Sequence, residues 1–296
     1  MNTLAIDIGG TKFALALFEG ERISLRLTRP TDREAGREWM LAQLEPLLRA
    51  WKSQLGIDRC AVGFGGPVDF PSQRVALSTH ASGWEDFPLV DYLKGLLDVP
   101  VILDNDANTG ALGEALYGTA RATAQQPAAR PLFYMTLSTG IGGGIVLEDD
   151  TLYRGANSYA GEIGHINVRP DGPACLCGSN GCLERMCSGI WLERDYGMPV
   201  PELFEDDDFV ARYVVDLARG LKAAVMLLNP AKIVIGGGIS RAGGRLFTPL
   251  REELRKQVPG WSRANVEVVP AALGTDSVLW GALALAKTMR ESGSRA

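Results

Sequence analysis

The first part of the chain alternates apolar runs with short turns, a pattern that predicts strands followed by a helix. Strands are expected at residues 3–8, 13–18 and 22–29, the last with period-two alternation. Residues 31–56 then carry apolar side chains at three- and four-residue spacing. This spacing predicts a helix that Thr31 or Asp32 caps and that Gly56 ends.

The remaining pattern predicts an α/β fold. Strands are expected within residues 59–70, 99–106, 131–138, 145–150, 151–155, 231–240 and 265–271. Helices are expected at residues 87–100, 106–118, 209–230 and 277–292. Residues 121–130 are small, polar and contain proline, which indicates an exposed link.

Two stretches resemble each other: IDIGGTKFALAL and LSTGIGGGIVL, about 130 residues apart. Each reads as strand, Gly/Thr-rich turn, strand, which suggests duplication of a β-β-β-α-β-α unit. We expect a small N-terminal lobe of residues 1–118, joined by a C-terminal helix at 275–296. Residues 119–274 would form a larger lobe that includes a cysteine-rich insertion.

Composition and charge exclude several classes of protein. The chain has 296 residues, 46% hydrophobic and 22% charged, with a mean hydropathy of +0.02, as in ordinary globular proteins. The net charge is −5 and no run of basic residues exceeds two, so nucleic-acid binding is not expected. No 18-residue apolar stretch and no signal peptide are recognised, so we expect a soluble cytoplasmic protein without a membrane partner.

Four of the five cysteines lie close together, in and after the stretch CLCGSNGCLE. The cysteines are Cys60, Cys175, Cys177, Cys182 and Cys187. A reducing cytoplasm disfavours a disulfide framework, and C-x-C-x4-C is not the C-x-x-C of a redox site. Three thiolates need one more ligand for a tetrahedral zinc site, and His165 lies ten residues before Cys175. The alternative is a set of buried free thiols beside a core histidine.

Three glycine-rich turns each follow an expected strand. They are Gly9-Gly10-Thr11-Lys12, Thr139-Gly140-Ile141-Gly142-Gly143-Gly144 and Gly236-Gly237-Gly238. Glycine lets backbone N–H groups approach an anion closely, so the turns are candidates for binding the phosphates and nucleoside of one nucleotide. None matches a P-loop or a clean G-x-G-x-x-G, which disfavours a Rossmann site. Ordinary tight turns are the alternative.

Acidic side chains stand at two strand ends. Asp7 could position a magnesium ion directly or through water, or could simply shape the turn. Asp104, Asn105 and Asp106 lie at a strand-to-helix junction, where one of them could be the helix cap. A carboxylate there can also accept the proton of a substrate hydroxyl that attacks a phosphate.

Glu162 and Glu184 flank the candidate metal site. A metal can order an irregular loop, and a metal-bound histidine keeps a second ring nitrogen for another partner. Two carboxylates and His165 could therefore form a polar site for hydroxyl groups. The alternative is that both glutamates are merely solvated.

With these motifs in this order, the sequence resembles the ROK (repressor, ORF, kinase) family of the actin/hexokinase-like superfamily, a ribonuclease H-like fold. The motifs DIGGTK, DNDANTGALGE, LSTGIGGGIVL, GEIGH, CLCGSNGCLE and IVIGGG carry the resemblance along nearly the whole chain. It implies two α/β lobes with a cleft that closes on ATP and a hexose, and transfer of phosphate to the sugar 6-hydroxyl. It also implies a homodimer or a tetramer.

The resemblance assigns roles to individual residues. Asp106 matches the general base. The sugar ligands would be Gly66, His80, Asn105, Asp106, Glu162, His165 and Glu184. The ATP and Mg²⁺ site would include Asp7, Gly9, Gly10, Thr11, Lys12, Thr139, Gly140, Gly237 and Gly238. A closed structural zinc site would include His165, Cys175, Cys177 and Cys182.

Two departures from the family pattern concern the sugar. GFGGPVD is shorter than the usual glycine-proline-glycine loop, and His80 stands where the family often has asparagine. Glucose is the expected substrate, with N-acetylmannosamine, N-acetylglucosamine, allose, fructose and an amino-glucose as alternatives. A sugar-responsive repressor is disfavoured, because Asp7 already stands in the first loop with no room for a DNA-binding domain before it. An actin-like ATPase is disfavoured as well, because such a protein would not need a sugar site ordered by zinc.

Overall fold

The computed structural model describes residues 1–78, 81–262 and 265–289. The chain divides into two compact units. Unit 1 contains Met1–Gly113, Gly155–Ser158 and the described residues from Val278 onward. Unit 2 contains Glu114–Arg154 and Tyr159–Ser277. Each unit has its own mixed sheet and its own hydrophobic core.

The sheet of unit 1 has five strands in the order β3-β2-β1-β4-β7. The strands are β1 (Asn2–Ile8), β2 (Lys12–Glu19), β3 (Arg22–Pro30), β4 (Arg59–Phe64) and β7 (Val101–Asn105). β1, β2 and β3 pair antiparallel, whereas β1, β4 and β7 run parallel. A small hairpin, β5 (Val68–Asp69) with β6 (Arg74–Val75), follows β4.

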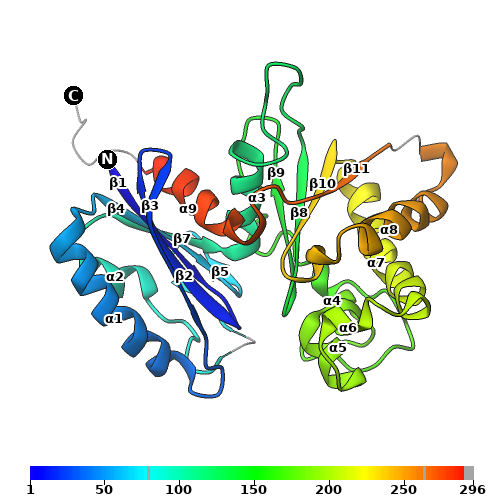
Figure 1. Ribbon diagram of the computed structural model, residues 1–296, viewed down its shortest axis with the longest axis horizontal. Coiled ribbons are helices and arrows are strands. Elements are labelled where there is room, and N and C mark those ends of the chain that lie inside the picture. The colour runs from blue at the N-terminus through cyan, green and yellow to red at the C-terminus, as the bar shows by residue number, and fades with distance from the viewer. Residues whose placement is uncertain (79–80, 263–264, 290–296) are drawn as a thin grey trace. The chain divides into compact units, whose positions relative to one another are not determined.

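Helices cover both faces of this sheet (Figure 1). α1 (Gly36–Leu55) and α2 (Leu89–Leu97) pack on the side where Ile6 is buried. α3 (Asp106–Leu116) and α9 (Ser277–Lys287) lie on the other side, where the ring of Trp280 meets Phe18 at 5.0 Å. That side carries alanines, such as Ala5, which let these helices approach closely.

α1 begins later than the pattern predicts. Asp32 Oδ1 accepts hydrogen bonds from the backbone N–H groups of Glu34 and Ala35, which forms a turn and not a helix cap. Gly36, the first residue of α1, has φ 69°, and a right-handed helix cannot extend back through a left-handed residue into this turn. The expected end is confirmed: Gly56 adopts φ 57° after Leu55.

The backbones of α3 and α9 touch. A Cβ on Gly281 of α9 would overlap the carbonyl group of Thr109 and lie 3.0 Å from the backbone nitrogen of Gly113, both in α3. Backbone atoms cannot turn aside as a flexible side chain can. Only glycine therefore allows the two helices to pack at this distance, which fixes the helix that begins at Asp106.

Unit 2 repeats the strand arrangement of unit 1. Its strands are β8 (Leu132–Leu137), β9 (Ile141–Val146), β10 (Lys232–Gly236) and β11 (Glu267–Pro270). The order β9-β8-β10-β11, with one antiparallel pair and then parallel neighbours, matches β2-β1-β4-β7. The expected strand at residues 151–155 is wrong: only a bridge between Val146 and Leu152 forms before Gly155 turns the chain at φ 72°.

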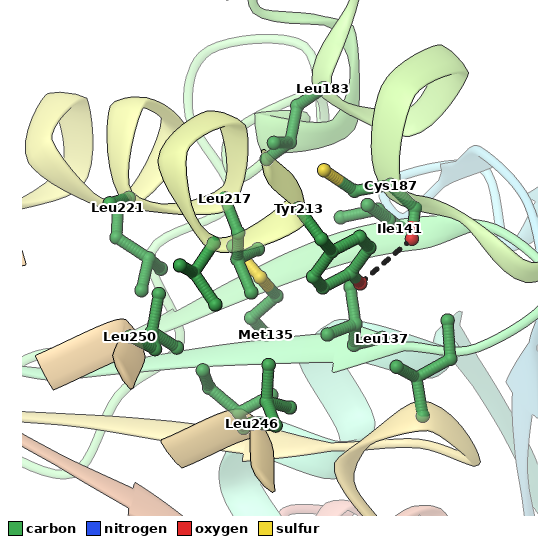
Figure 2. Packing of buried hydrophobic residues seen from close by; sticks show 14 of the residues in the cluster. Met135, Leu137, Ile141, Leu183, Cys187, Tyr213, Leu217, Leu221, Leu246 and Leu250 are labelled. Atoms are coloured by element: carbon green, nitrogen blue, oxygen red, sulfur yellow. Dashed lines mark hydrogen bonds between the residues drawn. The ribbon is translucent and has the colours of Figure 1, made fainter. Parts of the chain in front are cut away.

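α7 (Asp207–Leu228) and α8 (Gly244–Gln257) pack on one face of this sheet (Figure 1). Figure 2 shows Leu217 and Leu221 of α7 together with Met135 of β8 and Leu250 of α8. Asp206 caps α7 by accepting from two backbone N–H groups. The expected end at Asn229 and Pro230 is confirmed, with Asn229 left-handed.

Short helices connect the cysteine-rich segment to α7. They are α4 (Leu183–Cys187), α5 (Gly189–Tyr196) and α6 (Val200–Leu203). Tyr213 of α7 donates a 2.9 Å hydrogen bond to the carbonyl of Cys187 in α4 (Figure 2). Among the described residues, no helix is both long and apolar enough to cross a membrane.

The contact at Gly281 leads to a stability prediction. We expect Gly281→Ala to lower the free energy of unfolding by about 3 kcal/mol, because the new methyl group overlaps backbone that cannot yield. Urea denaturation measures the change. Gly95→Ala, at an exposed position of α2 with open space around the Cβ position, is the matched control. This control should raise stability by about 0.5–1 kcal/mol. Equal stability of the two variants would contradict the packing argument.

Candidate functional site

The first phosphate-loop candidate, residues 9–12, lies between β1 and β2 and is held from outside. Thr31 Oγ1 donates to the carbonyl of Gly9 at 3.0 Å, and Arg33 Nε donates to the carbonyl of Gly10 at 2.6 Å. Thr31, expected as a helix cap, therefore fixes the loop instead. Neither residue was identified as part of the site, because nothing local in the sequence links it to a turn some 20 positions earlier.

Asp106 lies beside this loop. It follows β7 and opens α3, while β1 ends at the loop. A Cβ on Gly65, after β4, would lie 3.5 Å from Asp106 Oδ2 and 3.4 Å from the Cα of Gly9. Three neighbouring parallel strands thus bring their carboxyl ends to one place, where α/β folds bind ligands. Asp7, buried near the end of β1, lies at the same edge.

Asn105 is the residue that caps α3. Its Oδ1 accepts from the backbone N–H groups of Ala107 at 2.9 Å and Asn108 at 3.1 Å. Its Nδ2 donates to the carbonyl of Gly66 at 3.0 Å. Asp104 is buried and accepts from the backbone N–H of Asn105 and from the Asn108 amide. Asn105 therefore joins the start of α3 to the Gly-Gly-Pro loop after β4.

The second glycine turn is held by the helices that follow the cysteines. The carbonyls of Ser138 and Thr139 accept from the backbone N–H groups of Gly189 at 2.7 Å and Ile190 at 3.2 Å, at the start of α5. The turn is shorter than expected: it ends at Gly140, because β9 already begins at residue 141, so the last three glycines of the motif lie in the strand and not in the turn. With their carbonyls bonded to α5, the residues of this turn are held in one conformation.

The third turn lies beside the second. Gly237, at φ 87°, packs so tightly on the end of β8 that a Cβ would overlap the carbonyl of Leu137. The Cβ position of Gly238 is open. Thr139-Gly140 and Gly237-Gly238 are therefore brought together within unit 2, as two parallel strands ending at one edge require.

Glu162, His165 and Glu184 form an acidic cluster in unit 2. Burial raises the pKa of Glu162; the His165 side chain acts in the opposite direction and the Glu184 charge adds to the rise. Glu184 Oε2 accepts a 2.8 Å hydrogen bond from the backbone N–H of Ile141, at the start of β9. Glu184 therefore connects the cluster to the strand that leaves the second turn.

A candidate metal site adjoins this cluster. His165, Cys175, Cys177 and Cys182 each offer one ligand atom, and all four atoms lie within 4.8 Å of one another. The sulfurs of Cys177 and Cys182 are 3.6 Å apart. This is close to the edge of about 3.8 Å of a tetrahedron of sulfurs at about 2.3 Å from zinc.

The histidine supplies a further observation that fits a metal. The Nδ1 atom of His165 is buried and has no hydrogen-bond partner in the described part of the chain. Burial raises the pKa of the Cys182 thiol to about 12, and the neighbouring thiols of Cys177 and Cys175 act in the same direction. Such buried, crowded thiols lose their protons when a metal binds. Cys187 and Cys60 lie outside the cluster and are buried.

The loop that carries the cysteines is tied to α7 by a buried carboxylate. Asp216 accepts from Arg169 Nε at 2.9 Å and from Arg219 Nη1 at 2.8 Å. The carbonyl of Gly181, beside Cys182, accepts from the backbone N–H of Arg169. The sequence did not identify Asp216 as part of the site, because 47 residues separate it from its main partner.

His80, expected as a sugar ligand, lies outside the described residues. A groove of about 480 Å³ between α8 and β11 is lined by Arg251, Leu254, Val266 and Glu267, among others. It lies at the amino ends of β10 and β11, whereas the glycine turn follows the carboxyl end of β10. The groove is therefore separate from the turns and clusters described above.

Comparisons with known proteins agree with this architecture. A glucokinase of Thermotoga maritima is 32% identical over 97% of this chain and 98% of its own. An N-acetylmannosamine kinase of Vibrio cholerae is 33% identical over 95% and 98%. The crystal structure of a ROK family glucokinase from Streptomyces griseus, in complex with glucose and AMPPNP, is 28% identical. It has a TM-score of 0.85 and covers 98% of this chain and 100% of its own. The ROK family model matches residues 3–289, so the chain belongs to the ROK family and has the α/β fold of these sugar kinases.

Proposed function

We propose that this protein transfers the γ-phosphate of ATP to the 6-hydroxyl of a hexose, with glucose as the preferred sugar. One observation carries the proposal: Asp106 lies at the carboxyl end of β7 beside the glycine loop that follows β1. The full-length similarity to glucokinases supports the reaction. The N-acetylmannosamine kinases match at comparable identity, which makes that sugar the second candidate.

The chemistry asked of the protein is mostly positioning. Asp106 accepts the proton of the attacking hydroxyl, which strengthens the nucleophile as it approaches phosphorus. The Gly9 N–H donates to the carbonyl of Lys12 within the turn, so the phosphates are bound by the other backbone N–H groups of residues 9–12 and by those of Thr139-Gly140. The side chains of Thr11 and Lys12 are further donors. Asp7 would position the Mg²⁺ that accompanies ATP. Gly237 and Gly238 leave space for the nucleoside.

The hexose is recognised by hydrogen bonds to its hydroxyl groups. Glu162 and Glu184 accept them, and His165 presents the ring nitrogen that the metal leaves unused. Asn105 and Gly66 contribute from the segment beside Asp106, and His80 is a further ligand. Because Asn105 Oδ1 already caps α3, its contact to sugar would use the second hydrogen of Nδ2.

We infer that the bound metal is zinc with a structural role. Three thiolates and one imidazole would supply the four ligands typical of a structural zinc site, which takes no substrate as a ligand. Zinc would order the irregular loop between His165 and Glu184 and so hold both ends of the acidic cluster. A cytoplasmic location stays a prediction from the sequence, and assembly as a homodimer or a tetramer stays a prediction from the family resemblance.

The substrate is tested with purified protein, ATP, Mg²⁺ and a panel of hexoses in a coupled assay for ADP formation. We expect glucose to give the highest kcat/KM, and N-acetylmannosamine, N-acetylglucosamine, allose, fructose and glucosamine to give lower values. A higher value for another sugar would change the substrate and keep the reaction. Failure of every hexose to raise ADP formation above the rate with water would overturn the proposed function.

Asp106→Asn should retain glucose binding but lose turnover by about 10²- to 10⁴-fold, because the amide cannot accept the proton. Steady-state kinetics and calorimetric binding of glucose check the two parts. Asp98→Asn is the control, since Asp98 is an exposed left-handed residue at the end of α2, where asparagine fits equally well. A near-normal kcat in Asp106→Asn would remove Asp106 from the mechanism.

Cys177→Ser should lose the metal, lower the melting temperature and raise KM for glucose, because the loop that bears Glu162 and Glu184 loosens. Metal analysis of the wild-type protein should find one zinc ion per chain. Cys60→Ala, which removes a buried thiol outside the cluster, should keep the zinc whatever its stability. Wild-type protein purified without any bound metal would contradict the site.

A further inference from the structure

Gln73 adopts a backbone conformation that glutamine rarely takes. It lies in the turn between β5 and β6 with φ 58°, in the left-handed region. Side chains other than those of Gly, Asn and Asp are uncommon there, and outliers of this kind concentrate at positions where function requires them. Glycine would adopt the same turn without strain. The glutamine side chain must therefore contribute something that glycine cannot.

That contribution is visible at the free edge of the sheet in unit 1. β7 is the last strand in the sheet order, so half of its backbone groups point away from β4. The side-chain amide of Gln73 bonds both groups of one of these residues. Leu103 N donates to Gln73 Oε1 at 2.8 Å, and Gln73 Nε2 donates to Leu103 O at 3.2 Å. The amide thus pairs with β7 as a residue of a further strand would.

The same amide also closes its own turn. Gln73 Nε2 donates to the carbonyl of Phe70 at 2.7 Å. The turn belongs to the hairpin whose two ends are joined by Ala76 N, which donates to Pro67 O at 3.0 Å. Gln73 therefore attaches the whole hairpin to β7, three residues before Asp106.

The attached segment begins at the proposed site. Gly66 immediately precedes the hairpin and accepts from Asn105 Nδ2, next to Asp106. A Cβ on Gly66 would lie 2.8 Å from the carbonyl of Leu77, so the chain that leaves the hairpin packs against the chain that enters it. A shift of the hairpin along β7 would move Gly66 relative to Asp106.

We propose that Gln73 is a positioning residue that sets the distance between the sugar-contacting loop at Gly66 and the carboxylate of Asp106. The proposal rests on the proposed function, since it assigns the hexose to that loop. A purely structural cap of the sheet edge would need the same hydrogen bonds but would leave substrate affinity alone. The difference between the two interpretations is therefore measurable.

Two substitutions separate the amide from the backbone strain. Gln73→Gly relieves the strain and removes the amide. Gln73→Asn keeps an amide and tolerates the left-handed conformation, but its side chain is one methylene too short to reach Leu103. We expect KM for glucose to rise about tenfold in both variants, with KM for ATP within about twofold of wild type, because small displacements near reacting atoms are costly. Hydrogen exchange at the Leu103 amide should accelerate at least about tenfold.

Asp98→Gly is the matched control, because it relieves a left-handed residue at φ 57° in an exposed position of the same unit. It should leave both KM values and the Leu103 exchange rate unchanged. Faster exchange at Leu103 with an unchanged KM for glucose would overturn the positioning role and leave a structural cap. Unchanged exchange would show that the hydrogen bond does not hold β7, and equal rises in both KM values would indicate general loosening; either result overturns the proposal.

The assay of the wild-type protein separates this proposal from the one on which it rests. If wild-type protein phosphorylates glucose and the variants match it, the positioning role alone is wrong. If wild-type protein phosphorylates no hexose, the proposed function fails, and the role of Gln73 in catalysis fails with it.

Discussion

The meeting of three parallel strand ends at Gly65 is the constraint on which the candidate site of unit 1 depends. β1 delivers the first glycine loop, β4 delivers Gly65 and β7 delivers Asp106. Because the strands are hydrogen-bonded neighbours, these groups cannot separate without breaking the sheet. The tight contact of Gly281 with α3 then fixes the direction in which the helix leaves Asp106. A loop and an acid from distant parts of the chain become neighbours through backbone geometry alone.

Unit 2 has the same arrangement of strands but adds to it the candidate metal site and the acidic cluster. Its hairpin turn and the turn after β10 meet at the carboxyl edge, as the corresponding turns do in unit 1. Where unit 1 adds a third antiparallel strand, unit 2 leaves the sheet after Leu152 and builds the irregular segment with the cysteines. The acidic cluster and the candidate metal site are therefore built from residues that lie outside the sheet. The two units thus share the order and direction of their strands and differ in the segments inserted between them.

The sequence predicted features that depend on neighbours in the chain. The glycine turns, the junction at Asp106 and the grouping of Cys175, Cys177 and Cys182 are local, and a short spacing of ligands has few geometric outcomes. The sequence also predicted the duplicated sheets, because the strand pattern repeats. It misplaced the start of α1, where Gly36 has a positive φ. Pattern alone does not give that angle. It also placed β9 four residues too late and expected a strand at 151–155, where only a bridge at Leu152 forms.

Contacts between distant residues were out of reach. Arg33 on the carbonyl of Gly10, Asp216 on Arg169 and Gln73 on Leu103 each join segments that only the folded chain brings together. The side chains involved are common surface types, so composition gave no warning. Their partners are backbone carbonyls or other charged groups, which every segment offers. Only the structure shows that the polar atoms of these residues, unlike those of similar side chains, lie within hydrogen-bond distance of a distant segment.

The hydrogen bond from Ile141 N to Glu184 has a thermodynamic meaning. In the proposed function, one carboxylate serves a sugar hydroxyl and also fixes the strand that leaves the nucleotide loop. If the binding of the hexose changes the orientation of that carboxylate, the hydrogen bond to Ile141 changes with it. The turn that binds ATP is then affected as well, and the same holds in the opposite direction. Linkage then requires reciprocity: the factor by which hexose alters the affinity for ATP equals the factor by which ATP alters the affinity for hexose. A single side chain can in this way make the binding of two substrates interdependent without any rearrangement of the fold.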